Sequence, residues 1–165
     1  MAILLAGRGN IRTRRLHRRF KNRLQSTGAF GPVRMRIADH RTPGPYRVEA
    51  ETEPGVFLAD DTYPVTTARI EIGFEVAGQS GTDSYWVNWI EPDRNFLLGW
   101  HQDQDHPDLG PVHIQVTQYT NTVDRTAAAY IDDHPMAVLE ARLDQLPDAL
   151  ASVQWDGDTV SGIEW

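Results

Sequence analysis

Histidine and aspartate side chains are concentrated in one short stretch of this sequence, HQDQDHPDLGPVH, between positions 101 and 113. Three of the six histidines of the chain fall there. Imidazole exchanges protons near neutral pH, and sets of His and Asp also bind metal ions. The residues with this potential are His101, Asp103, Asp105, His106, Asp108 and His113, with Arg94 a few positions earlier. This stretch is where the sequence most strongly indicates a chemical site.

If the stretch is catalytic, its residue types favour proton transfer by histidine. His101 and His113 would then act as acid and base, and Arg94 would stabilise negative charge on the substrate. His106 or Asp103 would orient one of these partners. Two other interpretations stay open, a merely solvated loop and a metal site. The spacings H-x4-H and H-x6-H match no familiar zinc signature, so the sequence defines neither a metal nor a cofactor.

The residues around this stretch predict paired strands that would position it. Residues 85–91 and 95–100 read as two strands joined by a tight turn, EPDR, and residues 112–118 alternate again as a third. Since His101 ends one strand and His113 begins the next, the two should lie at the same end of a strand pair and face each other. The tryptophans at 86, 89 and 100 alternate with apolar residues, which favours packing over base stacking.

The rest of the body predicts an α+β fold. Alternating segments at 46–53 and 68–76 add two strands, with a Pro/Gly-rich loop at 39–44 and a turn at 77–83. One convincing helix begins at Pro135, with His134 as its cap and an apolar stripe along one side. Pro147 is expected to end or kink it. We therefore predict a largely antiparallel sheet of four to five strands covered by this C-terminal helix.

Composition divides the chain into two unequal parts. Residues 1–36 hold ten of the 16 basic residues and none of the 23 acidic ones, which leaves residues 37–165 as one strongly acidic domain. Arginine outnumbers lysine fifteen to one, and an acidic, lysine-poor surface fits a halophilic source, although a GC-rich genome also favours arginine. There is no cysteine, so disulfides and Cys-bound zinc are excluded. No run approaches the roughly 20 apolar residues that span a membrane, and we expect a cytoplasmic protein.

The basic segment 1–36 has three interpretations. Leu16, Phe20 and Leu24 share one face of a helix whose other faces are covered by arginines. The segment could be an arm that binds phosphate in nucleic acid or at a membrane surface, or a helix that docks on the body or a partner. It could also be an extension produced by a start codon assigned too early, with Met35 as the alternative start.

The stretch from Tyr85 to Val116 resembles the core of the TumE-type toxin family and related haloarchaeal proteins of unknown function. The shared order is an aromatic strand (YWVNW), a turn and second strand (EPDRNFLLGW), a polar His/Pro loop (HQDQDHPDLG) and a strand opening GPVHIQV. A late helix, MAVLEARLDQL, also fits this order. The P-H-x-H pair of the family is here Pro111-Val112-His113, with one histidine lost. The family's arginine-aspartate-asparagine run is replaced by residues 100–103.

This resemblance implies a toxin-like, RNA-directed role, with an antitoxin protein, a homodimer mate or RNA as partner. A ribonuclease-like activity of the histidines is the first hypothesis for function. A second is a protein-binding module without enzymatic activity. The third is an accessory or structural protein encoded by a virus or plasmid.

Overall fold

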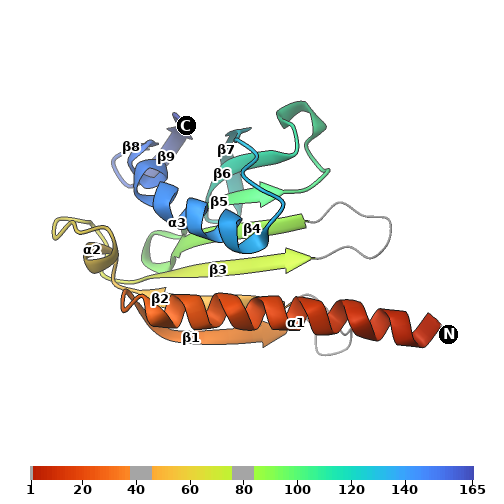
Figure 1. Cartoon of the computed structure of the whole chain (residues 1–165). Helices are drawn as coiled ribbons and strands as arrows, with labels where there is room; N and C mark the ends of the chain where they lie inside the picture. Colours follow the sequence, from red (N-terminus) through yellow and green to blue (C-terminus); the bar gives the residue numbers. More distant parts are fainter. Residues whose placement is uncertain (1, 38–45, 76–83) are drawn as a thin grey trace.

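The computed structural model describes residues 2–37, 46–75 and 84–165, and shows an α+β fold built on one antiparallel sheet (Figure 1). The expected loop at 39–44 with His40, the end of a strand at Val76 and the turn at 77–83 lie outside these residues. Seven strands follow one another in space in the order of the sequence. They are β1 (Phe30–Ile37), β2 (Tyr46–Thr52), β3 (Ala68–Glu75), β4 (Ser84–Glu91), β5 (Phe96–Gln102), β6 (Val112–Gln118) and β7 (Asn121–Ala127).

The strand count corrects the expected four to five. All five predicted strands form, and the structure adds β1, β7 and a separate hairpin of β8 (Val153–Asp156) and β9 (Thr159–Ile163). β1 and β7 are the edge strands, where fewer side chains are buried, so apolar residues do not alternate clearly in either one. Gly31 and Pro32 also fall in a register shift of β1, which hides its period in the sequence.

The basic N-terminal segment is not an arm: it forms helix α1 (Ala2–Ser26) followed by β1. α1 runs along β1 and β2 in Figure 1. Phe20 and Leu24 are fully buried in the main core, and Leu16 packs against it, which confirms the expected apolar face. The guanidinium of Arg23 also pairs with Glu140 of the C-terminal helix through two contacts of 2.5 and 2.8 Å. α1 is thus built into the domain.

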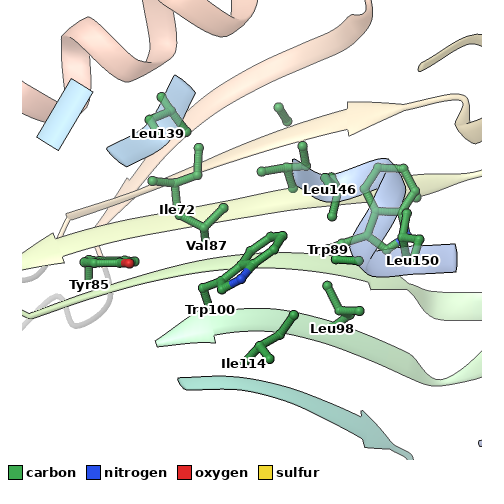
Figure 2. Packing of buried hydrophobic residues seen from close by; sticks show 14 of the residues in the cluster. Ile72, Tyr85, Val87, Trp89, Leu98, Trp100, Ile114, Leu139, Leu146 and Leu150 are labelled. Carbon is green, nitrogen blue, oxygen red and sulfur yellow. The ribbon is translucent and has the colours of Figure 1, made fainter. Parts of the chain in front are cut away.

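The C-terminal helix α3 (Pro135–Ala151) starts where the sequence predicted, with His134 at its N-cap. The core lies between α3, α1 and one face of the sheet, and Figure 2 shows Leu139 of α3 by Ile72 and Leu146 of α3 by Trp89 of the sheet. Of the two effects expected of Pro147, an end or a kink, the end is wrong, because the helix continues to Ala151. Its last turn buries Ala149 and Leu150, and this packing offsets the hydrogen bond that proline cannot make.

The two faces of the sheet differ in character. The face toward the helices carries the apolar residues of each strand, including Trp89 and Trp100, which confirms that these two tryptophans are core residues. The opposite side, here called the open face, is defined by Trp86, Asn88, His101, His113, Gln115 and Arg125 of β4–β7. Short helices complete the chain: α2 (Pro54–Phe57), η1 (Pro92–Arg94) and η2 (Pro107–Leu109). Across the described residues, no helix has both the length and the apolarity needed to cross a membrane.

Candidate functional site

Strand register brings the histidines of the open face together. Trp86 of β4 pairs with His101 of β5, and His101 pairs with His113 of β6, so these three residues form one row across adjacent strands. The imidazole centroids of His101 and His113 lie 5.5 Å apart. The expected opposition of His101 and His113 at one end of a strand pair is confirmed. Side chains in such a row point to the same side of the sheet because residues on a strand alternate between faces.

A single hydrogen bond orients His101. Its Nε2 lies 2.9 Å from Asn88 Oδ1. Because an amide oxygen only accepts, Nε2 carries the proton and Nδ1 keeps its lone pair in the neutral ring. Asn88 reaches this position over Gly99, where an added Cβ would lie 1.9 Å from Oδ1. Burial is the main cause that lowers the pKa of His101 to about 4, and the nearby His113 adds to it, so the ring is neutral at neutral pH.

His113 is almost completely buried, at 1% exposure, although it lies on the open face. The loop between β5 and β6 covers it, with His106 set edge-on to its ring at a centroid distance of 4.9 Å. Burial lowers the pKa of His113 as well. Its Nε2 has no hydrogen-bond partner in the described structure. A buried polar atom without a partner is costly, which makes this nitrogen a candidate for binding something else.

Arg125 of β7 is a site residue that the sequence did not indicate. Its Nε and Nη2 both donate to Gln115 Oε1, at 3.1 and 3.0 Å, and its Nη1 donates to His106 Nδ1 across 3.5 Å. The guanidinium thus sits beside the imidazole cluster, held by the neighbouring strand. The sequence does not indicate Arg125 because it does not indicate β7, the strand that carries it. An exposed edge strand shows no alternation of apolar residues. Arg125 is opposite Gln115 once the β6–β7 hairpin is placed.

Arg94, the arginine expected at the phosphate, does not reach the histidines. It lies in η1, in the β4–β5 turn, at the other end of β5 from His101. Its guanidinium pairs with the fully buried Glu91 at 2.6 Å and lies 4.1 Å from the centroid of the Trp155 ring. Glu91 also accepts hydrogen bonds from Tyr63 and Trp89. Arg94 therefore satisfies a buried carboxylate, and the guanidinium that lies beside the histidines is that of Arg125.

Asp103 follows β5 and joins the cluster as expected. Its Oδ1 accepts the backbone N–H of Asp105 at 3.1 Å, which holds the start of the loop. One potential ligand atom from each of His101, Asp103 and His113 lies within 4.8 Å of the other two. The sequence predicted the residues of this cluster without predicting which three would converge. Two imidazoles and a carboxylate could hold a divalent metal ion.

Trp86 gives the open face a flat aromatic surface. Unlike Trp89 and Trp100 it is half-exposed, and its indole covers Gly73, where an added Cβ would lie 2.0 Å from Cζ2. A cavity of about 350 Å³ lies beside it, lined by Trp86, Asn88, His101 and Asp103 together with Glu75, Ser84, Tyr85 and Gln102. The interpretation of Trp86 as a packing residue is incomplete, because it also borders the histidine site.

Two further features lie away from the histidines. Helix α1 exposes five arginines, Arg12, Arg14, Arg15, Arg18 and Arg19, for which no ion pair is seen in the described residues. A larger cavity of about 610 Å³ lies at the end of the sheet that contains the β4–β5 turn, and its lining includes Phe30, Val56 and Pro92. Val56 is 65% exposed there.

No protein-family model matches this chain, and no curated protein or solved structure matches it either.

Proposed function

We propose that this protein is a small RNA-cleaving enzyme with a toxin-like role, and that its site is the histidine cluster of the open face. The observation that carries the proposal is the convergence of three imidazoles and one guanidinium. The ring centroids of His101, His106 and His113 are separated by 4.9 and 5.5 Å along the cluster, and Arg125 contacts His106. Groups of this kind supply the proton transfers and charge stabilisation that phosphodiester cleavage requires.

The reaction that suits these groups uses the ribose 2′-hydroxyl of RNA as the nucleophile. A base in the cluster takes the 2′-hydroxyl proton while the 2′-oxygen bonds to phosphorus. The bond from phosphorus to the 5′-oxygen then breaks, and that oxygen leaves with a proton from a second group. Arg125 would stabilise the negative charge that grows on the phosphoryl oxygens.

Trp86 supports RNA as the substrate class. Single-stranded RNA is commonly recognised by stacking of its unpaired bases on exposed aromatic rings. Trp86 provides a half-exposed ring next to His101 in the same row of the sheet, and the cavity of about 350 Å³ lies over both. A base on Trp86 would place the adjoining ribose and phosphate toward the histidines.

The test is cleavage of a single-stranded RNA oligonucleotide by the purified chain. The unmutated protein should cleave it, and His101→Ala and His113→Ala should each reduce the rate by about 100-fold or more. His134→Ala is the matched control, because His134 is exposed at the N-cap of α3, away from the cluster. Loss of activity in the control to the same degree, or no cleavage by the unmutated protein, would contradict the proposal.

The toxin-like role is tested separately in cells. Induction of the unmutated chain should arrest growth, and the two cluster variants should relieve that arrest while remaining folded. RNA cleavage without growth arrest would support the enzymatic activity and contradict the toxin-like role.

A protein-binding module is the second candidate, and the larger cavity is the observation that favours it. That cavity of about 610 Å³ lies at the other end of the sheet and presents the exposed Val56. Concave, partly apolar surfaces of this kind suit a side chain from a partner such as an antitoxin. Val56→Asp should then abolish capture of that partner and leave RNA cleavage unchanged.

A further inference from the structure

We propose that His101, Asp103 and His113 bind one divalent transition-metal ion on the open face. The three residues come from the end of β5, the loop that follows it and the start of β6, so the paired strands bring them together. One ligand atom of each already lies within 4.8 Å of the others. Ligands bound to one zinc ion, each about 2.0–2.2 Å from it, lie roughly 3.3 Å apart in tetrahedral geometry. Small side-chain rotations would therefore close the site.

One ring nitrogen of His101 is hydrogen-bonded, which leaves the other available to a metal ion. Its Nε2 proton is donated to Asn88 Oδ1 at 2.9 Å, which leaves Nδ1 as the nitrogen with a lone pair. Metal-binding histidines usually donate their other ring N–H in this way, and the acceptor fixes both the tautomer and the angle of the ring. The open face thus contains the outer partner of the site as well as its ligands.

His113 provides the independent observation. It is 1% exposed, and its Nε2 has no hydrogen-bond partner in the described structure. Most buried side-chain nitrogens are satisfied by protein or ordered water, so an unpartnered one on a residue whose neighbours are an imidazole and a carboxylate indicates a ligand. A metal ion would give this buried imidazole a partner.

The ligand types narrow the choice of ion. Two imidazole nitrogens and one carboxylate oxygen suit Zn²⁺, Fe²⁺, Co²⁺ and Ni²⁺ better than Ca²⁺ or Mg²⁺, which prefer oxygen. Three protein ligands leave at least one coordination position for water, as in catalytic zinc sites. The cavity of about 350 Å³ beside His101 and Asp103 gives room for that water and for a substrate.

This inference concerns the same residues as the proposed RNA-cleaving site but does not require its substrate to be RNA. With an ion in place, His101 and His113 act as ligands. The water on the ion, made more acidic by the metal, then takes the role of the base. Compared with the mechanism without a metal, the site lies in the same place, but its imidazoles have different roles.

The experiment is a metal titration of the full chain. The protein is treated with EDTA, freed of the chelator and titrated with Zn²⁺ by calorimetry and with Co²⁺ by visible absorption. We expect one ion per chain and a cobalt spectrum of low coordination number. His101→Ala, Asp103→Asn and His113→Ala should each weaken binding by about tenfold or more, and Asn88→Leu by about 10–100-fold. Asn88→Asp keeps an acceptor for His101 Nε2 and should restore most of the affinity.

Two matched variants make the test specific. His106→Ala removes an imidazole that packs against His113 but is not among the three ligands, so metal affinity should fall less than it does in any of the three ligand variants. His134→Ala, at the exposed N-cap of α3, should change nothing. Equal loss in these variants, or no saturable binding to the unmutated chain, would overturn the metal site.

The metal site and the RNA-cleaving function fail in distinguishable ways. RNA cleavage that survives EDTA and shows no dependence on added Zn²⁺ or Co²⁺ would retain the histidine enzyme and reject the metal site in catalysis. Saturable binding of one ion, sensitive to the three ligand variants, with no RNA cleavage under any condition, would establish the metal site and reject the function. Cleavage lost with EDTA and restored by the ion supports both.

Discussion

The indole of Trp86 occupies the space that a side chain at position 73 would need. A Cβ on Gly73 would lie 2.0 Å from Trp86 Cζ2, closer than any non-bonded contact allows. Gly73→Ala should therefore displace the indole from the sheet. Base stacking on an aromatic ring contributes about 1–3 kcal/mol, so this variant should bind a cleavage-resistant, 2′-O-methylated RNA about 5-fold to 100-fold more weakly. Fluorescence of the tryptophans checks the displacement.

Gly31→Ala is the matched control for that prediction. Gly31 is in β1, and the nearest atom to an added Cβ there is 3.7 Å away, an ordinary contact. If both alanine variants bind the RNA equally well, Trp86 is not part of the binding surface.

Substitutions of Arg125 and Arg94 should separate activity from stability. Arg125→Ala removes the guanidinium beside the imidazole cluster, so the cleavage rate should fall by about 100-fold while stability changes little. Arg94→Ala leaves the fully buried Glu91 without its ion-pair partner, which should cost about 3–5 kcal/mol in the free energy of unfolding. The rate per folded molecule should stay unchanged. Urea unfolding measures the free energy of unfolding, and the RNA assay measures the cleavage rate. Loss of cleavage in Arg94→Ala with unchanged cleavage in Arg125→Ala would place the site at the β4–β5 turn.

His17 should make the stability of the protein depend on pH. The ring is fully buried, with Nε2 accepting the backbone N–H of Phe74 at 3.1 Å and Nδ1 donating to the Thr13 carbonyl at 2.7 Å. Burial lowers the pKa of His17 from its ordinary value of 6.5. The unfolded chain therefore binds more protons between these two pKa values. The contribution of His17 is complete above the unfolded pKa and is lost as pH falls toward the folded one.

The matched variant for this prediction is His17→Gln, which offers Phe74 an acceptor that does not titrate. Comparison of its unfolding free energy with that of the unmutated chain isolates His17 from the other buried histidines. The difference should vary below the ordinary pKa by up to about 1.4 kcal/mol per pH unit. A difference that is constant with pH would mean that His17 does not carry this dependence.

Helix α1 should be required for folding. A chain that begins at Met35 lacks α1 and the first part of β1, so it leaves the core around Phe74 uncovered on one side. We expect such a chain not to unfold cooperatively in a thermal melt followed by circular dichroism. The finer test is Phe20→Ala, which should cost about 3–5 kcal/mol because Phe20 is fully buried.

The control for α1 is Arg19→Ala, on the exposed side of the same helix, which should change stability by no more than about 0.5 kcal/mol. A chain starting at Met35 with an unaltered melting temperature would show that α1 contributes nothing to the domain.

Periodicity predicted the strands that are buried on one face and failed for those that are not. β3 alternates cleanly because Ile70, Ile72 and Phe74 face the helices, and its pattern was sufficient to place it. β7 carries Arg125 on an exposed edge and shows no such pattern. Since the sequence does not indicate β7, it does not indicate Arg125 either, and closeness along the chain points to Arg94 instead. The sequence does not show that Glu91 is buried and that Arg94 pairs with it.

The histidine cluster was predictable because a hairpin turns local sequence into spatial proximity. His101 and His113 flank one loop, so the pairing of β5 and β6 was enough to bring them together. Gly73 and Gly99 could not be predicted as site residues from the sequence. Their role depends on which strand pairs with which. Gly73 and Gly99 leave room for Trp86 and Asn88, a relationship between strands that periodicity does not contain.

The most direct test of the proposal that the open face is the working site is nuclear magnetic resonance of the tryptophan indoles and histidine rings. A cleavage-resistant single-stranded RNA is added to the protein labelled with ¹⁵N. We expect the signals of Trp86 and His101 to shift and those of the buried Trp89 and Trp100 to stay unchanged. Shifts confined to residues around Val56, or none at saturating RNA, would contradict it.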